Sequence, residues 1–285
     1  MNFRTDRACE LKTDLNKKTG GVSAKEEKYG EIIINTITVE NEIGERLLGK
    51  PKGTYYTFTL PEYSENSTDN ITVKLICTRL RHLLPKKQGT VLVVGLGNRD
   101  ITPDALGPFA SKNVLATRHI RSEILAENDF EDLKPVAVLA PGVLGKTGIE
   151  TLEIIKGAVN TVKPSAVIVI DAFAARSAER LGKTVQLASS GICPGSGVGN
   201  SRKAVNGESL GVPVISIGVP TVVDALTLAG DAAGENANLP QSISEMFVTP
   251  REIDLIIERS AKIISESINA ALQPAYTIDE INDLL

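Results

Sequence analysis

A buried strand that enters a glycine-rich turn constrains the fold of this chain more than any other segment. The segment is Val91–Pro108, VLVVGLGNRDITPDALGP, in which four apolar residues precede Gly95 and Gly97. A strand, a tight turn and then a helix are typical of α/β proteins, which place functional side chains at the carboxyl edge of a parallel sheet. Asp104, which lies just past the turn, is therefore the first candidate catalytic residue.

The segments after this turn alternate between strand and helix patterns. Strands are predicted at 90–95, 136–140, 165–171, 184–188 and 212–219, and helices from about residue 104, at 149–162 and from about Val222. This alternation predicts an α/β fold with a mostly parallel sheet flanked by helices on both faces. Two β-branched segments that come earlier, 31–39 and 53–60, predict an extra antiparallel β ribbon beside the sheet.

The two ends of the chain carry different patterns. Residues 1–30 are polar and mixed in charge, which is typical of a loosely held arm. Apolar positions at helical spacing predict a helix at 71–84 and a long amphipathic helix at 249–272. Thr249, followed by Pro250 and Glu252, predicts a capping arrangement at the start of the long helix.

Composition excludes several classes of function. The 31 basic and 35 acidic residues give a net charge of -4, which does not favour nucleic acid or a membrane as a direct partner. No apolar run reaches the ~18 residues of a membrane-spanning helix. Three widely spaced cysteines fit a reducing cytoplasm better than a disulfide framework. With two histidines and no H-E-x-x-H motif, neither a metal site nor a cofactor is expected.

Carboxylates are the best candidates for chemistry. Asp104, Asp171 and Asp224 each follow a predicted parallel strand, so they are expected at the same edge of the sheet. Two close carboxylates can share one proton, so that the neutral member acts as an acid and the ionised member activates water. The alternative is that each aspartate caps a helix.

A second hypothesis is a phosphate or nucleotide site. The segment from Gly142 to Thr147 follows a strand and approaches the G-x-x-x-x-G-K-[ST] motif, with Lys146 and the distant Asp171 as its charged residues. Ala140 stands where the motif has its first glycine, and Pro141 lacks a backbone donor that a phosphate cradle requires. The match is therefore defective.

A second glycine loop, 191–199, is a candidate wall of an extended substrate groove. We assign Asn98, Gly195, Ser196, Gly197 and Asp224 to this groove as candidates. Nucleophilic catalysis has weaker support in this loop. Ser196 lacks the G-x-S-x-G context, and Cys193 has only His82 and His119 as possible imidazole partners.

Five long motifs together resemble one protein family. They are GLGNRDITPDALGP at 95–108, APGVLGKTGIET at 140–151, IDAFAAR at 170–176, GICPGSGVGN at 191–200 and GVPVISIGVPTVVDA at 211–225. The chain resembles the spore germination proteases of endospore-forming bacteria over most of residues 1–260. The resemblance implies an endopeptidase that degrades the small acid-soluble spore proteins during germination. It also implies a fold similar to that of the hydrogenase-maturation peptidases.

The resemblance further implies an atypical aspartic peptidase. Its two catalytic aspartates fall on the TPDALGP and IDAFAAR motifs, which places them at Asp104 and Asp171, although the Asp-Thr-Gly signature of ordinary aspartic peptidases is absent. A homotetramer in the cytoplasm of the forespore and spore core is implied as well. A phosphate-handling enzyme and a non-enzymatic module that binds spore proteins are the alternative functions.

Members of this family are made as zymogens that remove a short amino-terminal propeptide. Their cleavage sites consist of Thr-Glu, an apolar residue and Ala-Ser-Glu, which Thr5–Glu10, TDRACE, approximates. We therefore predict self-processing between Asp6 and Arg7. Residues 1–6 would form the propeptide and residues 7–285 a single α/β peptidase domain.

Overall fold

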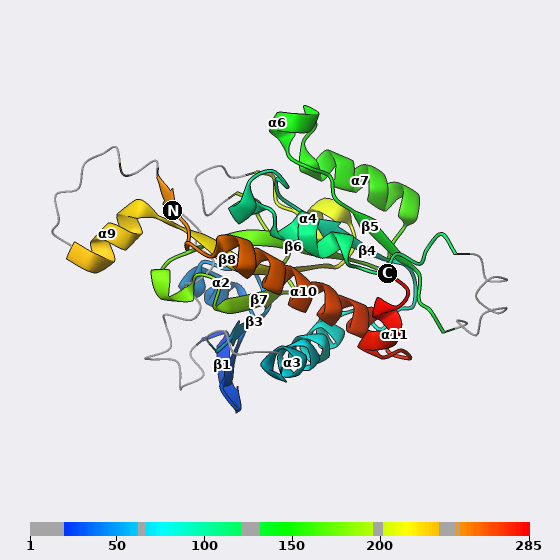
Figure 1. The fold of residues 1–285 in the computed structure, drawn as a ribbon, viewed down its shortest axis with the longest axis horizontal. Helices are drawn as coiled ribbons and strands as arrows, with labels where there is room; N and C mark the ends of the chain where they lie inside the picture. The colour runs from blue at the N-terminus through cyan, green and yellow to red at the C-terminus, as the bar shows by residue number, and fades with distance from the viewer. Residues whose placement is uncertain (1–19, 62–66, 121–131, 196–201, 234–242, 244–245) are drawn as a thin grey trace.

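One mixed sheet forms the centre of the fold (Figure 1). The computed structural model describes residues 20–61, 67–120, 132–195, 202–233, 243 and 246–285. The strands are β1 (Val22–Tyr29), β2 (Ile32–Val39), β3 (Gly53–Thr59), β4 (Val91–Gly95), β5 (Val136–Leu139), β6 (Ala166–Ala175), β7 (Thr184–Ala188), β8 (Val214–Asp224) and β9 (Phe247–Val248). Their order is β1-β2-β3-β7-β8-β6-β4-β5, and β9 pairs with β8.

The sheet has a parallel part and an antiparallel part. Strands β8, β6, β4 and β5 pair in parallel, as the strand and helix alternation predicted. Strands β1, β2, β3 and β7 pair antiparallel with their neighbours, and β7 joins the ribbon to β8. The α/β class is confirmed, with antiparallel strands that extend further than the predicted ribbon.

The extra length of the ribbon comes from β1. Residues 1–30 were expected to form a loose arm, but Val22–Tyr29 pairs with β2 from Val22↔Val39 to Tyr29↔Ile32. The strand lies at the edge of the sheet and most of its residues are at least partly exposed. The strand is polar because most of its side chains face solvent, so its sequence does not show an apolar strand pattern. Its hydrogen-bonded pairing with β2 makes it a strand all the same.

Helices cover both faces of the sheet (Figure 1). They are α2 (Glu42–Leu48), α3 (Ser67–Leu83), α4 (Leu106–Lys112), α6 (Leu144–Thr147), α7 (Thr151–Val162), α8 (Gly207–Leu210), α9 (Ala225–Ala233), α10 (Ile253–Leu272) and α11 (Ile278–Asn282), with short 3-10 helices η2 (Thr102–Asp104) and η3 (Ala178–Arg180). Side chains of α3, α4 and α10 pack on one face, and those of α7 and α8 pack on the other. In the described parts of the chain, no helix combines the length and apolar character needed to cross a membrane.

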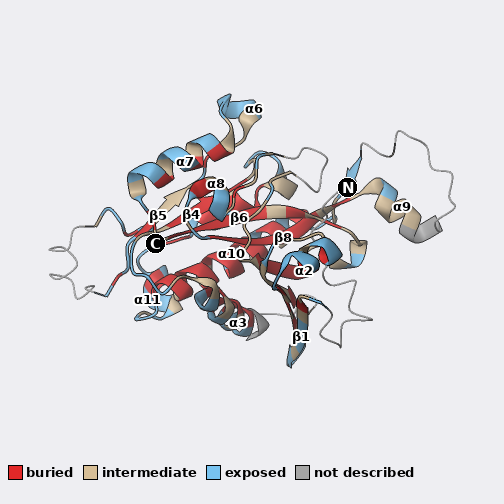
Figure 2. Ribbon diagram, turned by 180° about the vertical axis from the view of Figure 1, so that it is seen from behind, coloured by how far each residue is buried: buried red, intermediate tan, exposed pale blue. Residues whose placement is uncertain are grey.

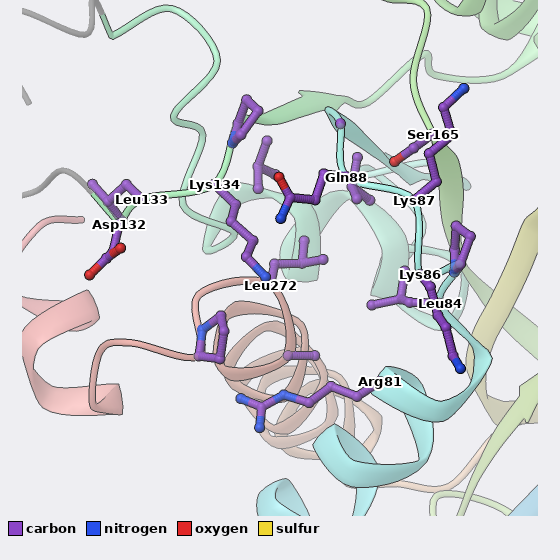
Figure 3. Close-up of a pocket in the computed structure, with 17 residues that line it drawn as sticks. Arg81, Leu84, Lys86, Lys87, Gln88, Asp132, Leu133, Lys134, Ser165 and Leu272 are labelled. Carbon is purple, nitrogen blue, oxygen red and sulfur yellow. The ribbon is translucent and has the colours of Figure 1, made fainter.

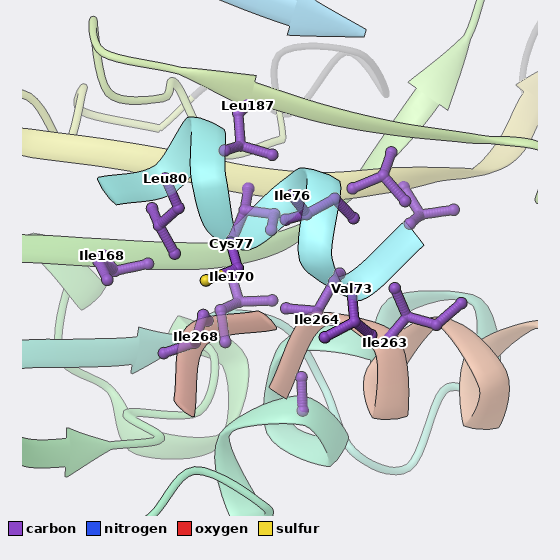
Figure 4. Packing of buried hydrophobic residues seen from close by; sticks show 14 of the residues in the cluster. Val73, Ile76, Cys77, Leu80, Ile168, Ile170, Leu187, Ile263, Ile264 and Ile268 are labelled. Atoms are coloured by element: carbon purple, nitrogen blue, oxygen red, sulfur yellow. The ribbon is translucent and has the colours of Figure 1, made fainter. Parts of the chain in front are cut away.

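The larger hydrophobic cluster lies between the sheet and the helices α3 and α10 (Figure 4). Ile76 of α3 and Ile264 of α10 both pack in this cluster with Ile168 and Ile170 of β6. Figure 2 shows that buried residues follow the central strands and the side of α10 that faces them. Because side chains alternate along a strand, Val167 and Val169 of β6 face the opposite cluster, under α7.

Three predicted boundaries shift in the structure. β6 was expected to end at Asp171, where the apolar residues stop, but it continues to Ala175. β8 continues to Asp224, so α9 begins at Ala225 and not near Val222. Both strands are longer than predicted because they pair with each other as far as Ala175↔Val223. The long helix begins at Ile253 without a side-chain cap. Thr249, predicted to cap it, instead donates its hydroxyl to the Thr221 carbonyl at 2.9 Å.

Truncation of a core side chain of α10 tests this packing. Ile264 is 0% exposed, so Ile264→Ala should lower the free energy of unfolding by about 2–5 kcal/mol through lost burial and an unfilled cavity. Leu255→Ala, on the same helix but 60% exposed, should change it by less than about 0.5 kcal/mol. Urea unfolding followed by circular dichroism measures both values. Equal losses for the two variants would contradict the packing described here.

Candidate active site

Asp104 is held by a tight turn at the end of β4. Gly97, in this turn, has a φ of 113°, and a Cβ built on it would lie 1.9 Å from the Asp104 carbonyl oxygen. A side chain is therefore excluded there by both backbone conformation and space. The Thr221 hydroxyl of β8 donates to the Pro103 carbonyl at 2.7 Å. The turn is thus fastened to the sheet one residue before Asp104.

Asp171 lies within β6, opposite Gly218 of β8. A Cβ built on Gly218 would lie 2.2 Å from the Asp171 carbonyl oxygen and would also meet the Phe173 ring, so this position excludes a side chain. The amide of Leu96, just past β4, donates to the Ile170 carbonyl at 2.8 Å. This bond places the turn that carries Asp104 beside Asp171.

Each carboxylate accepts one backbone hydrogen bond in the described structure. The Asn98 amide donates to Asp104 Oδ2 at 2.7 Å, and the Ala172 amide donates to Asp171 Oδ1 at 3.0 Å. Asp171 is only 6% exposed, whereas Asp104 is half-buried. The two carboxylates therefore differ in their access to water although both line the same cleft.

Burial is the main influence on both acids. It raises the pKa of Asp171, and the nearby charge of Asp104 raises it further, to about 8, against a smaller lowering by the Ala172 amide. Burial also raises the pKa of Asp104, while the hydrogen bond from the Asn98 amide opposes this shift. At neutral pH, the geometry and charges favour a proton on Asp171.

The two aspartates open into a cleft of about 670 Å³. Asn98 and Gly195, two candidates for a substrate groove, line this cleft, and so does Cys193. Ser196, Gly197, Asp6 and Arg7 lie outside the described residues. Among the described residues that line this cleft there is no histidine, so an imidazole partner for Cys193 is not found there.

Asp224, a candidate for the substrate groove, lies where α9 begins. Its carboxylate accepts hydrogen bonds from the Thr227 amide and the Thr227 hydroxyl, both at 2.7 Å, where α9 begins. Asp224 is not among the described residues that line the cleft. The capping alternative considered for the three aspartates is therefore confirmed for Asp224.

The loop from Gly142 to Thr147 does not form the phosphate cradle suggested by its motif. The amides of Lys146 and Thr147 both donate to the Val143 carbonyl, at 2.9 and 3.1 Å, within the short turn of α6. The Lys146 ammonium pairs with Asp100. Donors that would hold a phosphate are thus engaged within the protein, so the structure does not favour the phosphate hypothesis.

Several residues that shape the cleft were not identified from the sequence. Thr221 and Phe173 lie on strand segments whose length was underestimated, so they were not expected near the aspartates. Arg202 also lines the cleft, with its guanidinium 3.6 Å from Glu150. Thr227, a hydroxyl residue three positions after Asp224, was the available signal in the sequence that this aspartate caps a helix.

A second cavity, of about 710 Å³, lies at the opposite end of the parallel strands, where Val91 and Val136 begin β4 and β5 (Figure 3). Its charged lining is mainly basic, with Arg81, Lys86, Lys87, Lys134 and Asp132. It lacks the paired carboxylates of the first cleft. No group of three or more potential metal ligands occurs in the part of the chain that the structure describes.

Comparison with known proteins identifies the family. The sequence model of the germination proteases matches residues 2–234. The chain belongs to the germination protease family. This result confirms the resemblance that the five motifs indicated.

Related germination proteases come from several organisms. That of Caldanaerobacter subterraneus subsp. tengcongensis is 43% identical over 321 aligned residues, which cover 100% of this chain and 98% of the relative. That of Clostridium tetani is 40% identical over 323 aligned residues, which cover 100% of this chain and 100% of the relative. The Bacillus subtilis germination protease is 45% identical over 242 residues, covering 80% of this chain and 65% of the relative.

A solved structure similar to this chain is a NiFe hydrogenase maturation protease, HycI, from Thermococcus kodakarensis KOD1. The TM-score is 0.36 and the identity 20%, with 67% of this chain and 98% of that chain covered. At this level the similarity carries no argument about the site. The α/β assignment rests on the sheet and helices described above.

The raised pKa of Asp171 predicts how stability depends on pH. The folded state holds this proton more tightly than the unfolded state, so its contribution to stability is complete below about pH 4 and is lost as pH rises to about 8. Asp171→Asn cannot ionise and should escape this loss.

Urea unfolding at several pH values between 4 and 8 measures the difference. The two proteins should be similarly stable at pH 4, and Asp171→Asn should become progressively more stable than the parent as pH rises. A stability difference that stays constant over this range would contradict a proton held by Asp171.

Proposed function

We propose that this protein is an endopeptidase that begins the degradation of small acid-soluble spore proteins during germination, using Asp104 and Asp171 to activate water. The observation that carries the proposal is the presence of two differently buried carboxylates in one cleft of a chain that belongs to the germination protease family. A peptidase acts on protein substrates, and a cleft of about 670 Å³ has room for several residues of an extended peptide.

In the proposed reaction, the two aspartates have opposite protonation states. Asp104 is the ionised member, because it is the more exposed and the Asn98 amide stabilises its charge. It takes a proton from water while the water oxygen bonds to the scissile carbonyl carbon. When the carbon–nitrogen bond breaks, Asp171 gives its proton to the departing amine. Proton transfer from Asp104 to Asp171 then restores the starting state.

The remaining elements of the proposal come from the resemblance to the family. The protein would be made as a zymogen in the forespore and would act in the spore core. It would assemble as a homotetramer. Its partners would be its protein substrates, without direct contact with nucleic acid or a membrane, in keeping with a net charge of -4.

Substitution of the aspartates tests the catalytic pair. Incubated with a peptide that contains Thr-Glu-Phe-Ala-Ser-Glu, the processed protein should cleave the peptide, and Asp104→Asn and Asp171→Asn should each reduce kcat/KM by about 100-fold or more through loss of proton transfer. Mass spectrometry of the peptide fragments measures the rate.

Asp224→Asn and Asp279→Asn are matched controls for removing an aspartate charge. Asparagine caps a helix as well as aspartate does, and Asp279 is exposed on α11, so both variants should keep nearly full activity. Full cleavage by both Asp104→Asn and Asp171→Asn would refute the pair. Binding of spore-protein peptides without cleavage by any processed form would indicate the binding-module alternative.

Self-processing is tested on the protein before it is activated. Intact-mass measurements during incubation should show loss of residues 1–6 by the parent, because its own site would cut between Asp6 and Arg7. Asp104→Asn, purified in the same way, should keep its full mass. Equal trimming of the parent and of this variant would show that another protease removes the segment.

A further inference from the structure

One edge of β6 lies open beside the two aspartates. The pairing of β6 with β4 ends at Gly95↔Ile170, whereas its pairing with β8 continues as far as Ala175↔Val223. In the described part of the chain, β6 beyond Ile170 therefore has a strand neighbour on one side only. This segment begins with Asp171 itself, so the open edge starts where the proposed chemistry takes place.

Strand geometry fixes which backbone groups point toward this open edge. The Ile170 carbonyl points toward β4, since it accepts from the Leu96 amide at 2.8 Å, and the Val167 amide points toward β8, since it donates to the Pro213 carbonyl at 2.9 Å. Backbone direction alternates at each residue of a strand, and at the register shift after Phe173 the extra residue, Thr221, belongs to β8 and not to β6. The amide and carbonyl groups of Ala172 and Ala174 therefore point toward the side that β4 has left.

Within the part of the chain that the structure describes, most of these groups have no hydrogen-bond partner on the open side. The Ala172 amide donates to the Asp171 carboxylate, which leaves the Ala172 carbonyl and both backbone groups of Ala174 on the open side. Ala172, Phe173 and Ala174 all line the cleft that contains the aspartates. Both alanines are only half-buried, and their methyl groups are small enough to leave space for a neighbouring chain.

We propose that the substrate polypeptide binds as an extended strand along Ala172–Ala174, in the position that β4 would occupy if it continued. Main-chain hydrogen bonds then hold the peptide in register, and the scissile bond lies beside Asp171. An unpaired strand edge selects an extended polypeptide because only a backbone presents donors and acceptors at the matching spacing. This inference rests on the proposed peptidase function and specifies how its substrate is held.

The proposed binding mode predicts that every second backbone amide of the peptide contributes to binding. Successive amides of a paired strand point to opposite sides, so only every second amide of the substrate can donate to β6. A series of Thr-Glu-Phe-Ala-Ser-Glu peptides, each with one backbone amide replaced by an ester, removes these donors one at a time. Binding is measured by calorimetry with Asp104→Asn, which should cleave the peptide about 100-fold more slowly than the parent or slower still.

Ester substitution at alternate positions should weaken binding by roughly fivefold, the value of one net hydrogen bond, whereas the intervening esters should leave affinity within about twofold. Hydrogen exchange gives a second measurement on the protein. The Ala174 amide should exchange more slowly when the unmodified peptide is present. The Phe173 amide points toward β8 and serves as the internal control, with an unchanged rate.

A profile without a period of two, or an Ala174 amide whose exchange is unaffected by peptide, overturns the proposed binding mode. Cleavage of the same unmodified peptide by the parent protein is measured in parallel. If cleavage depends on Asp104 and Asp171 while the ester series shows no period, the peptidase function stands and the strand-pairing inference fails. If no cleavage depends on these aspartates, the proposed function fails as well.

Discussion

The parallel pairing of β4 with β6 determines where chemistry can occur in this protein. β4 ends beside Ile170 and the chain then leaves the sheet through a glycine turn, while β6 continues through Asp171. The hydrogen bond from the Leu96 amide to the Ile170 carbonyl is at the end of the pairing between β4 and β6. Because the two strands part there, the turn of Asp104 and the carboxylate of Asp171 share a cleft that a longer β4 would fill.

The site is supported by contacts that reach well beyond the two carboxylates. Thr249 donates to the Thr221 carbonyl, and Thr221 in turn donates to the Pro103 carbonyl beside Asp104. These two hydrogen bonds connect the segment before α10 to β8, and β8 to the turn of η2. Such rigid support is needed because burial disfavours the ionised form of Asp171, and a site that relaxed would admit water and lose that effect.

The sequence indicated local features of the site better than its long-range ones. The glycine turn before Asp104 was evident from Val91–Pro108 alone, since the strand, the turn and their order are local properties. Asp171 was placed at the end of a strand because the apolar residues stop there. Pairing with β8 carries the strand further, and no pattern within β6 itself reports that partner. The polar strand β1 was missed for the same reason.

The choice among three aspartates illustrates a second limit. Position after a strand did not separate Asp104 and Asp171 from Asp224, since an aspartate ahead of a helix has the same local pattern whether it caps the helix or faces a cleft. The resemblance to the germination proteases selected the first two. The hydrogen bonds from Thr227 then give Asp224 its separate, structural role.

The order of strands also has a consequence for how the chain folds. In the sheet that the described residues form, the amino-terminal ribbon is connected to the parallel strands through β7, and just past β7 the Thr54 amide donates to the Ser189 hydroxyl across 135 positions of sequence. During synthesis the ribbon therefore emerges long before its partner, and the edge of β3 that β7 later covers remains unpaired in the interval. Closing so long a loop delays completion of the sheet. The cleft needs β6 and β8 together, so it cannot form before the residues of β8 have been synthesised.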